Sequence, residues 1–234
     1  MTRSDASPSR QLILALLVGL GAASLVFYAV PALDLSTASL FYDGQGFPIA
    51  SNRPVEALRM LMYMAEDVGF LLTVAFALVS VRRGRVLNLA YRDWLYQASI
   101  FLLGPGLIVN GILKRFWGRA RPYQITAFGG DKDFAPAWVI SDQCAANCSF
   151  VSGEMAGATA LAVALFIILQ ANQGRMTPAS HRMAQGLALA IPLLTAWQRM
   201  AVGRHFLSDV VIAGFLVAVL AALLRPVVYR KPSV

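Results

Sequence analysis

The sequence predicts an all-α fold, an integral membrane bundle of six transmembrane helices. Of its 234 residues, 58% are hydrophobic and only 14% are charged, whereas about a quarter of the residues are charged in a soluble domain. Apolar runs close to the ~20 residues that cross a bilayer recur along the whole chain. The basic residues lie mainly in short segments between these runs.

The apolar runs place the predicted spans in order along the chain. Each run is long enough, or nearly so, to cross the hydrocarbon core as a helix. Glu66 and Asp67 interrupt the second run, and we expect them to face the interior of the bundle or to mark a helix end. The predicted spans are residues 12–30, 55–81, 94–116, 152–171, 183–202 and 208–228.

The basic residues between the spans alternate between the two sides of the predicted bundle. The richer side faces the cytoplasm by the positive-inside rule, which places both termini there. Residues 34–54, residues 119–151 and the turn at Arg204 fall on the opposite side. The predicted cytoplasmic cations are Arg3, Arg10, Arg82, Arg83, Arg85, Arg92, Arg175, Arg182, Arg225, Arg230 and Lys231.

Composition also limits the number of domains and the classes of partner. The chain has no internal repeat, low-complexity segment or long linker, so we expect one membrane domain, residues 1–234. The formal net charge of +8 does not indicate nucleic-acid binding, because the cations form no long basic run. A membrane and a lipid are the expected partners, and the oligomeric state is not predicted.

The two cysteines of the chain, Cys144 and Cys148, share one polar segment. Four residues apart, they can form a disulfide if that segment faces an oxidising compartment. Two free thiols are an equally good interpretation. We expect no metal here, because a structural zinc site needs about four ligands and no histidine lies nearby.

Three polar clusters stand at the edges of the apolar runs, on the side opposite the predicted cytoplasmic face. The first contains Lys114 and Arg121, the second comprises residues 152–154, and the third contains Arg199, His205 and Asp209. Charged groups are costly near hydrocarbon, so such a cluster is a candidate functional site. The chemistry of the three clusters fits binding a phosphate and attacking it.

In the third cluster, His205 and Asp209 are four residues apart and therefore share one face of a helix. The carboxylate can fix the imidazole tautomer, which leaves the other ring nitrogen as a nucleophile or base. Arg199 can hold a phosphate through two parallel hydrogen bonds. A buried structural triplet is the alternative, and the neighbouring cations favour the functional interpretation.

The first cluster brings two cations to one place. Lys114 supplies a point charge and Arg121 a planar fork, and together they can offset the charge of a phosphoryl group. We expect Arg115 and Arg119 to be interfacial instead, in contact with lipid headgroups. For the whole cluster, the alternative is a basic helix end that extends toward the membrane surface.

The second cluster opens the fourth predicted span, where backbone N–H groups of a helix N-terminus can hold an anion. Ser152 can cap the helix and also donate to a phosphate, while Gly153 allows close approach. Glu154 is unusual, because a carboxylate beside a phosphate is repelled unless it carries a proton. A protonated Glu154 is a candidate general acid.

In order and spacing, the clusters resemble the signature of the type 2 phosphatidic acid phosphatase family, which is related to vanadium haloperoxidases and bacterial acid phosphatases. The pattern Lys, six residues, Arg-Pro is matched by Lys114 and Arg121-Pro122. The second part of the family pattern is Pro-Ser-Gly-His, and this chain has Val151-Ser152-Gly153-Glu154 there. The third part is Ser-Arg, then five residues, a His, three residues and an Asp. This chain has Gln198-Arg199, His205 and Asp209 at those places. Residues 34–43 also resemble the outer loop of bacterial membrane members.

The resemblance implies a single membrane phosphatase domain, with core motifs within residues 114–209, and a reaction that uses no metal or cofactor. It implies that His205 attacks phosphorus and forms a phosphohistidine, and that Asp209 orients and supports His205. The implied phosphate-binding residues are Lys114, Arg121, Ser152, Gly153 and Arg199.

The chain departs from the family pattern at Glu154, which replaces the histidine that protonates the leaving group. The other histidine, His181, falls in a predicted cytoplasmic segment, on the wrong side to substitute. Either Glu154 is the acid, or the leaving group needs little help, as when a diphosphate releases phosphate. Loss of activity is a third alternative. Val151 and Gln198 replace proline and serine, which should alter geometry rather than remove the reaction.

The resulting hypothesis is a multi-pass lipid phosphatase of a bacterial inner membrane, with its active site facing the periplasm. Candidate substrates are lipid A, undecaprenyl diphosphate, phosphatidylglycerol phosphate and phosphatidic acid. Overall similarity to lipid A phosphatases favours lipid A. The alternatives are a lipid phosphotransferase that shares the phosphohistidine and a non-catalytic lipid-binding membrane protein.

Overall fold

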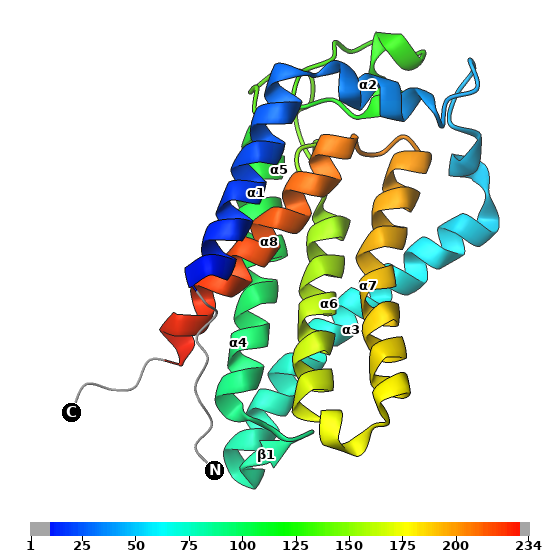
Figure 1. Ribbon diagram of the computed structural model, residues 1–234. Coiled ribbons are helices and arrows are strands. Elements are labelled where there is room, and N and C mark those ends of the chain that lie inside the picture. Colours follow the sequence, from blue (N-terminus) through cyan, green and yellow to red (C-terminus); the bar gives the residue numbers. More distant parts are fainter. Residues whose placement is uncertain (1–9, 230–234) are drawn as a thin grey trace.

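The computed structural model describes residues 10–229 and shows a bundle of long helices (Figure 1). The fold is mostly helical, as predicted. Three of the predicted cytoplasmic cations, Arg3, Arg230 and Lys231, lie outside the described residues. The long helices are α1 (Arg10–Ala29), α3 (Arg53–Arg83), α4 (Tyr91–Phe101), α6 (Gly153–Ala171), α7 (Pro178–Ala201) and α8 (Leu207–Val228).

The bounds of these helices follow the predicted spans to within a few residues. α4 continues into the π-helical segment η2 (Leu102–Leu113) and the short α5 (Lys114–Phe116), and together they form the third long apolar segment. Among the described residues, five helices are long and apolar enough to cross a membrane, and α7 is not one of them. The membrane-bundle class therefore fits, while the sixth span stays a prediction.

The two ends of the bundle differ in their connections. At one end, Figure 1 shows the start of α1, the end of α8 and the hairpin of β1 (Arg85–Val86) and β2 (Leu89–Ala90). The α6–α7 connection, with η5 (Gln173–Arg175), lies at this end as well. α2 (Ala32–Ser39) lies at the other end, where α6 begins and α7 ends. All three polar clusters belong to that second end.

Helix α6 lies in the middle of the bundle and packs against α3, α7 and α8. Small side chains let helix backbones approach closely, which is a main source of helix association in membranes. The tight packing fixes the start of α6 beside the end of α7 and the start of α8. The buried residues of α6 are Ala156, Gly157, Ala158, Ala160, Leu161, Ala162 and Ala164.

A second layer covers the end of the bundle that carries the clusters. Residues 34–54, predicted as a loop, contain most of α2 and the 3₁₀ turn η1 (Pro48–Ser51). Two further 3₁₀ turns follow the first cluster, η3 (Pro122–Gln124) and η4 (Thr126–Phe128). A small buried cluster joins this layer to the α7–α8 turn through Phe206, which directly follows His205. Its buried members are Ala38, Phe47, Ala120, Ile125, Phe128 and Phe206.

Candidate active site

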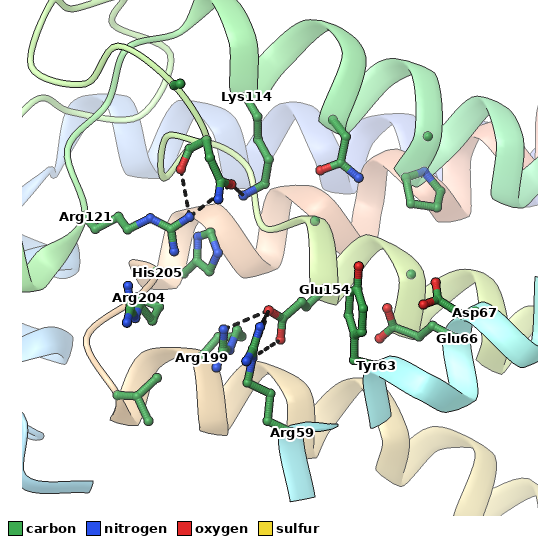
Figure 2. A pocket seen from close by; sticks show the side chains of 18 of the residues that line it. Arg59, Tyr63, Glu66, Asp67, Lys114, Arg121, Glu154, Arg199, Arg204 and His205 are labelled. Atoms are coloured by element: carbon green, nitrogen blue, oxygen red, sulfur yellow. Dashed lines mark hydrogen bonds and ion pairs between the residues drawn. The ribbon is translucent and has the colours of Figure 1, made fainter. Parts of the chain in front are cut away.

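A cavity of about 850 Å³ lies at this end of the bundle, and residues of all three polar clusters line it (Figure 2). The structure therefore brings the clusters together in space. Two of the predicted site residues, Ser152 and Asp209, are fully buried behind the cavity wall. The predicted catalytic and phosphate-binding residues that face the cavity are Lys114, Arg121, Gly153, Glu154, Arg199 and His205.

Asp209 lies directly behind His205, in the first turn of α8. Asp209 Oδ2 is 3.6 Å from His205 Nδ1 and accepts hydrogen bonds from Ser149 Oγ at 2.6 Å and the Phe206 N–H at 2.8 Å. Oδ1 accepts one from Arg119 Nη1 at 2.7 Å. The 3.6 Å separation is longer than a hydrogen bond, as is common for catalytic pairs without a ligand. Nδ1 of His205 nevertheless faces Asp209, so Nε2 is the ring nitrogen that is left to face the cavity.

Arg119 is not at the lipid interface, and the expectation for it was wrong. It is fully buried, and its Nη2 donates to Asp34 Oδ2 at 2.8 Å while Nη1 donates to Asp209. Its guanidinium also lies 4.4 Å from the centre of the Phe206 ring. A charge is buried in this way only when partners offset the loss of water, and two carboxylates do so here. Arg115, in contrast, is exposed.

The surroundings of His205 keep its imidazole neutral. Burial, together with the nearby Lys114 cation, lowers the pKa of His205 to about 3, although Asp209 acts in the opposite direction. A neutral imidazole has a lone pair on one ring nitrogen and can therefore attack an electrophile. The other histidine, His181, lies near the start of α7, at the opposite end of that helix from the cavity.

Asn147 holds two cations of the cavity wall in place. Its Oδ1 is 3.4 Å from Lys114 Nζ and 3.2 Å from Arg121 Nη2, and its backbone carbonyl accepts from Arg121 Nη2 at 2.8 Å. Cys144 and Cys148 are joined by a disulfide, with their Cα atoms 5.6 Å apart. The disulfide closes a short loop that contains Asn147. It therefore limits the backbone motion of Asn147, which positions Lys114 and Arg121.

Ser152 and Gly153 shape the start of α6. Ser152 Oγ accepts a backbone N–H at 3.3 Å and caps the helix, and the Ser152 N–H donates to the Asp209 carbonyl at 3.1 Å. A Cβ at Gly153 would lie 3.1 Å from Lys114 Cε and 2.8 Å from Asn110 Oδ1. The missing side chain at Gly153 therefore lets Lys114 pass close to the helix and reach the cavity.

Glu154 forms ion pairs with two guanidinium groups (Figure 2). Its Oε1 accepts from Arg199 Nη1 at 2.9 Å and from Arg59 Nη2 at 3.1 Å. Arg59 also forms an ion pair with Glu56 at 2.7 Å. In this arrangement Glu154 is a hydrogen-bond acceptor, and it holds Arg199 against the cavity.

Sequence patterns do not single out four further side chains of the site, namely Asp34, Arg59, Asn147 and Ser149. Asp34 and Arg119 are 85 positions apart, and Arg59 and Glu154 are 95 apart. Pairs at such separations have no periodic signal in a single sequence. A weak signal exists for Arg59 alone, since it is a cation inside a predicted apolar span.

The fold and the site together define a class of protein. An apolar helical bundle presents a neutral histidine, backed by a carboxylate, to a cavity lined by cations. This arrangement suits nucleophilic attack on a phosphate group at a membrane surface, as in a membrane phosphatase. The chain belongs to the PAP2 superfamily, whose family model matches residues 94–232. The predicted resemblance is confirmed.

Proteins named lipid A 4'-phosphatase are similar to this chain over most of its length. The protein from Rhizobium leguminosarum is 36% identical over 218 residues, covering 85% of this chain and 89% of that protein. The protein from Francisella tularensis subsp. novicida is 31% identical over 210 residues, covering 88% and 91%. No solved structure matches the chain. The chain is an enzyme, a phosphatase that hydrolyses a lipid phosphate, as predicted.

Proposed function

We propose that this phosphatase removes a phosphate from lipid A at the periplasmic face of the inner membrane, through a phosphohistidine intermediate. The observation that carries the proposal is the pair of His205 and Asp209 beside a cavity lined by cations. The relatives named lipid A 4'-phosphatase support the choice of substrate, because they match over most of both chains. In this proposal residues 1–234 form one domain with six spans.

In the first step, Nε2 of His205 attacks phosphorus, and an N–P bond forms as the bond to the lipid oxygen breaks. Lys114, Arg121 and Arg199 offset the charge on the phosphoryl oxygens. At the start of α6, the Ser152 hydroxyl and the Gly153 backbone N–H are further proposed donors to the same oxygens. Asp209 stabilises the positive charge that develops on the ring.

In the second step, the intermediate is hydrolysed. Before substrate binds, Glu154 is paired with Arg199 and Arg59. In this proposal the phosphate takes over Arg199, Glu154 takes up a proton from solvent, and it then protonates the departing lipid oxygen in the first step and is left as a carboxylate. It then accepts a proton from the water that attacks the phosphohistidine. The N–P bond breaks, inorganic phosphate leaves, and His205 and Glu154 return to their starting forms.

The test is phosphate release by the purified protein in detergent without added metal. Lipid A, phosphatidic acid, undecaprenyl diphosphate and phosphatidylglycerol phosphate are compared at equal surface concentration. We expect the highest kcat/KM for lipid A, and a loss of at least about a thousandfold in His205→Ala, because the nucleophile is gone. A preference for another lipid would overturn the substrate, and full activity of His205→Ala would overturn the mechanism.

The proton-donor role of Glu154 makes a separate prediction about leaving groups. Glu154→Gln should slow hydrolysis of lipid phosphates, whose leaving alcohols are poor, by about a hundredfold. It should slow an activated aryl phosphate much less, because that leaving group needs no proton. The measurement is kcat with both substrates for the wild type and the variant. Equal slowing would leave Glu154 only the role of holding Arg199.

A further inference from the structure

The cavity has two chemically different halves. The half that contains His205 is lined by five cations, namely Arg59, Lys114, Arg121, Arg199 and Arg204, and by Glu56 and Glu154, which are paired with Arg59 and Arg199. The other half extends along α3 and is lined by the carboxyl groups of Glu66 and Asp67, together with Tyr63. Figure 2 shows His205 on one side of Glu154 and both α3 carboxyl groups on the other. A ligand that fills the cavity therefore meets an excess of cations at one end and carboxyl groups at the other.

Glu66 has an unpaired acceptor. Its side chain is only 8% exposed, and among the described residues no donor lies within hydrogen-bond distance of its Oε1. It packs against α6 at Gly157, where a Cβ would overlap the Glu66 carboxyl. A carboxyl placed inside an apolar bundle without a partner is costly. Glu66 also lines the cavity, so rotation of its carboxyl group toward a hydrogen-bond donor of a bound ligand would remove that cost.

The reaction geometry tells which part of the substrate reaches this half of the cavity. In phosphoryl transfer, the attacking and leaving atoms lie roughly in line on opposite sides of phosphorus. With His205 as the nucleophile, the leaving oxygen points toward Glu154, and the headgroup that carries it extends toward Glu66 and Asp67. The α3 half is therefore the place for the leaving headgroup.

The chemistry of the α3 half limits what that headgroup can be. The carboxylate of Asp67 repels a second phosphate, so a diphosphate is disfavoured there. The carboxyl groups of Glu66 and Asp67 accept hydrogen bonds from hydroxyl and amide N–H groups, and the Tyr63 ring adds a flat surface against which a sugar ring can pack. Further along, Phe70, Phe101 and Leu102 line the same cavity and offer an apolar surface for acyl chains.

We propose that Tyr63, Glu66 and Asp67 form a sugar subsite, in which the two carboxyl groups bind hydroxyl or amide groups of the saccharide that bears the phosphate. The inference deepens the proposed function, on which it rests, by assigning substrate selection to α3. The three residues lie outside the three-part family signature. They are specificity residues that contact the leaving group rather than the phosphate.

The test compares Glu66→Met and Asp67→Ala with the wild type on two substrates. Lipid A carries the sugar, and p-nitrophenyl phosphate does not. We expect kcat/KM for lipid A to fall about tenfold or more in each variant, since each loses a hydrogen bond made to the substrate. Hydrolysis of p-nitrophenyl phosphate should change less than about twofold. Thr73→Val, a buried polar change on the same helix away from the cavity, is the matched control.

A second measurement separates this inference from the proposed function. Lipid A from which both phosphates have been removed should inhibit p-nitrophenyl phosphate hydrolysis by the wild type, and about tenfold less well in Asp67→Ala. Asp67 is exposed, so this variant should fold even if Glu66→Met does not. Equal inhibition of both proteins, or equal losses on both substrates, would overturn the sugar subsite. Failure of the wild type to hydrolyse lipid A, with the sugar inhibition intact, would overturn only the proposed function.

Discussion

Arg119 is the residue whose surroundings differ most from those expected for its position in the sequence. It joins Asp34 and Asp209 by ion pairs of 2.8 and 2.7 Å, and all three side chains are inaccessible to solvent. The network fixes the carboxylate behind His205 and at the same time ties α2 to the start of α8. A single side chain thus links the covering layer to the carboxylate behind His205.

Replacing Arg119 should therefore damage both stability and activity. Arg119→Met leaves two buried carboxylates without a counter-charge, which should lower the free energy of unfolding by about 3–5 kcal/mol. Thermal unfolding in detergent, followed by circular dichroism, measures the change. Arg115→Met is the matched control, because Arg115 is exposed and only four positions away. Equal stability of the two variants would contradict the network.

The lowered pKa of His205 makes a prediction about protonation. Its pKa of about 3 lies below the ordinary value, so the imidazole stays neutral as the pH falls through the range where a free histidine gains a proton. An ordinary histidine with a pKa of about 6.5 would be roughly 90% protonated at pH 5.5. In the folded protein His205 should still be neutral there.

NMR of the protein labelled with ¹⁵N-histidine measures this protonation directly. The chain has two histidines, so His181→Gln leaves the His205 signals alone in the spectrum. Since the unfolded chain binds a proton below about pH 6.5 and the folded chain does not, His205 also makes the fold less stable as the pH falls. A midpoint near 6.5 in the folded protein would contradict the buried, neutral nucleophile.

At the scale of elements, the turn between α7 and α8 sets the distance between Arg199 and His205. Gly203 in this turn has φ +65, a conformation that favours glycine, and its Cβ would lie 2.5 Å from the Phe47 ring. The Gly203 carbonyl accepts from the Tyr123 N–H at 3.1 Å, which joins the turn to η3. The turn therefore depends on both its glycine and the covering layer.

Gly203→Ala should cost about 1–3 kcal/mol of stability, because an alanine is strained at this positive φ and Phe47 must move. Since His205 moves with the turn, kcat/KM should fall by about tenfold or more. The control is Gly174→Ala in the α6–α7 connection, where an added Cβ meets nothing within 4 Å. Steady-state kinetics on both variants gives the comparison, and similar losses in the two would argue against a special role for the turn.

At the scale of the whole molecule, the proposed orientation can be tested from the two ends of the bundle. Gln45 lies at the end that carries the site and Gln173 at the opposite end, and both are exposed. We expect Gln45→Cys to react with a membrane-impermeant maleimide in intact spheroplasts. Gln173→Cys should react only after the membrane is opened. The opposite pattern would place the site in the cytoplasm.

Much of the fold could be predicted from the sequence, because hydropathy is a local property. The predicted span 152–171 and the observed α6 (Gly153–Ala171) differ by one residue at the start. The proximity of His205 and Asp209 was also predictable, since the two residues are one helical turn apart. The burial of Arg119 between two carboxylates was not predictable. Whether a cation near a helix end meets lipid or a carboxylate depends on what covers that end.

The sequence by itself determined the membrane class, the order of the helices and the three polar clusters, since these depend on composition and short spacings. Only the tertiary structure decided which groups surround each cluster. Asp34 reaches Arg119 across 85 positions, and Arg59 reaches Glu154 across 95. The same packing of α3 against α6 places Glu66 in the cavity. The physical reason is that contacts between distant segments arise from packing the whole bundle, which no local pattern records.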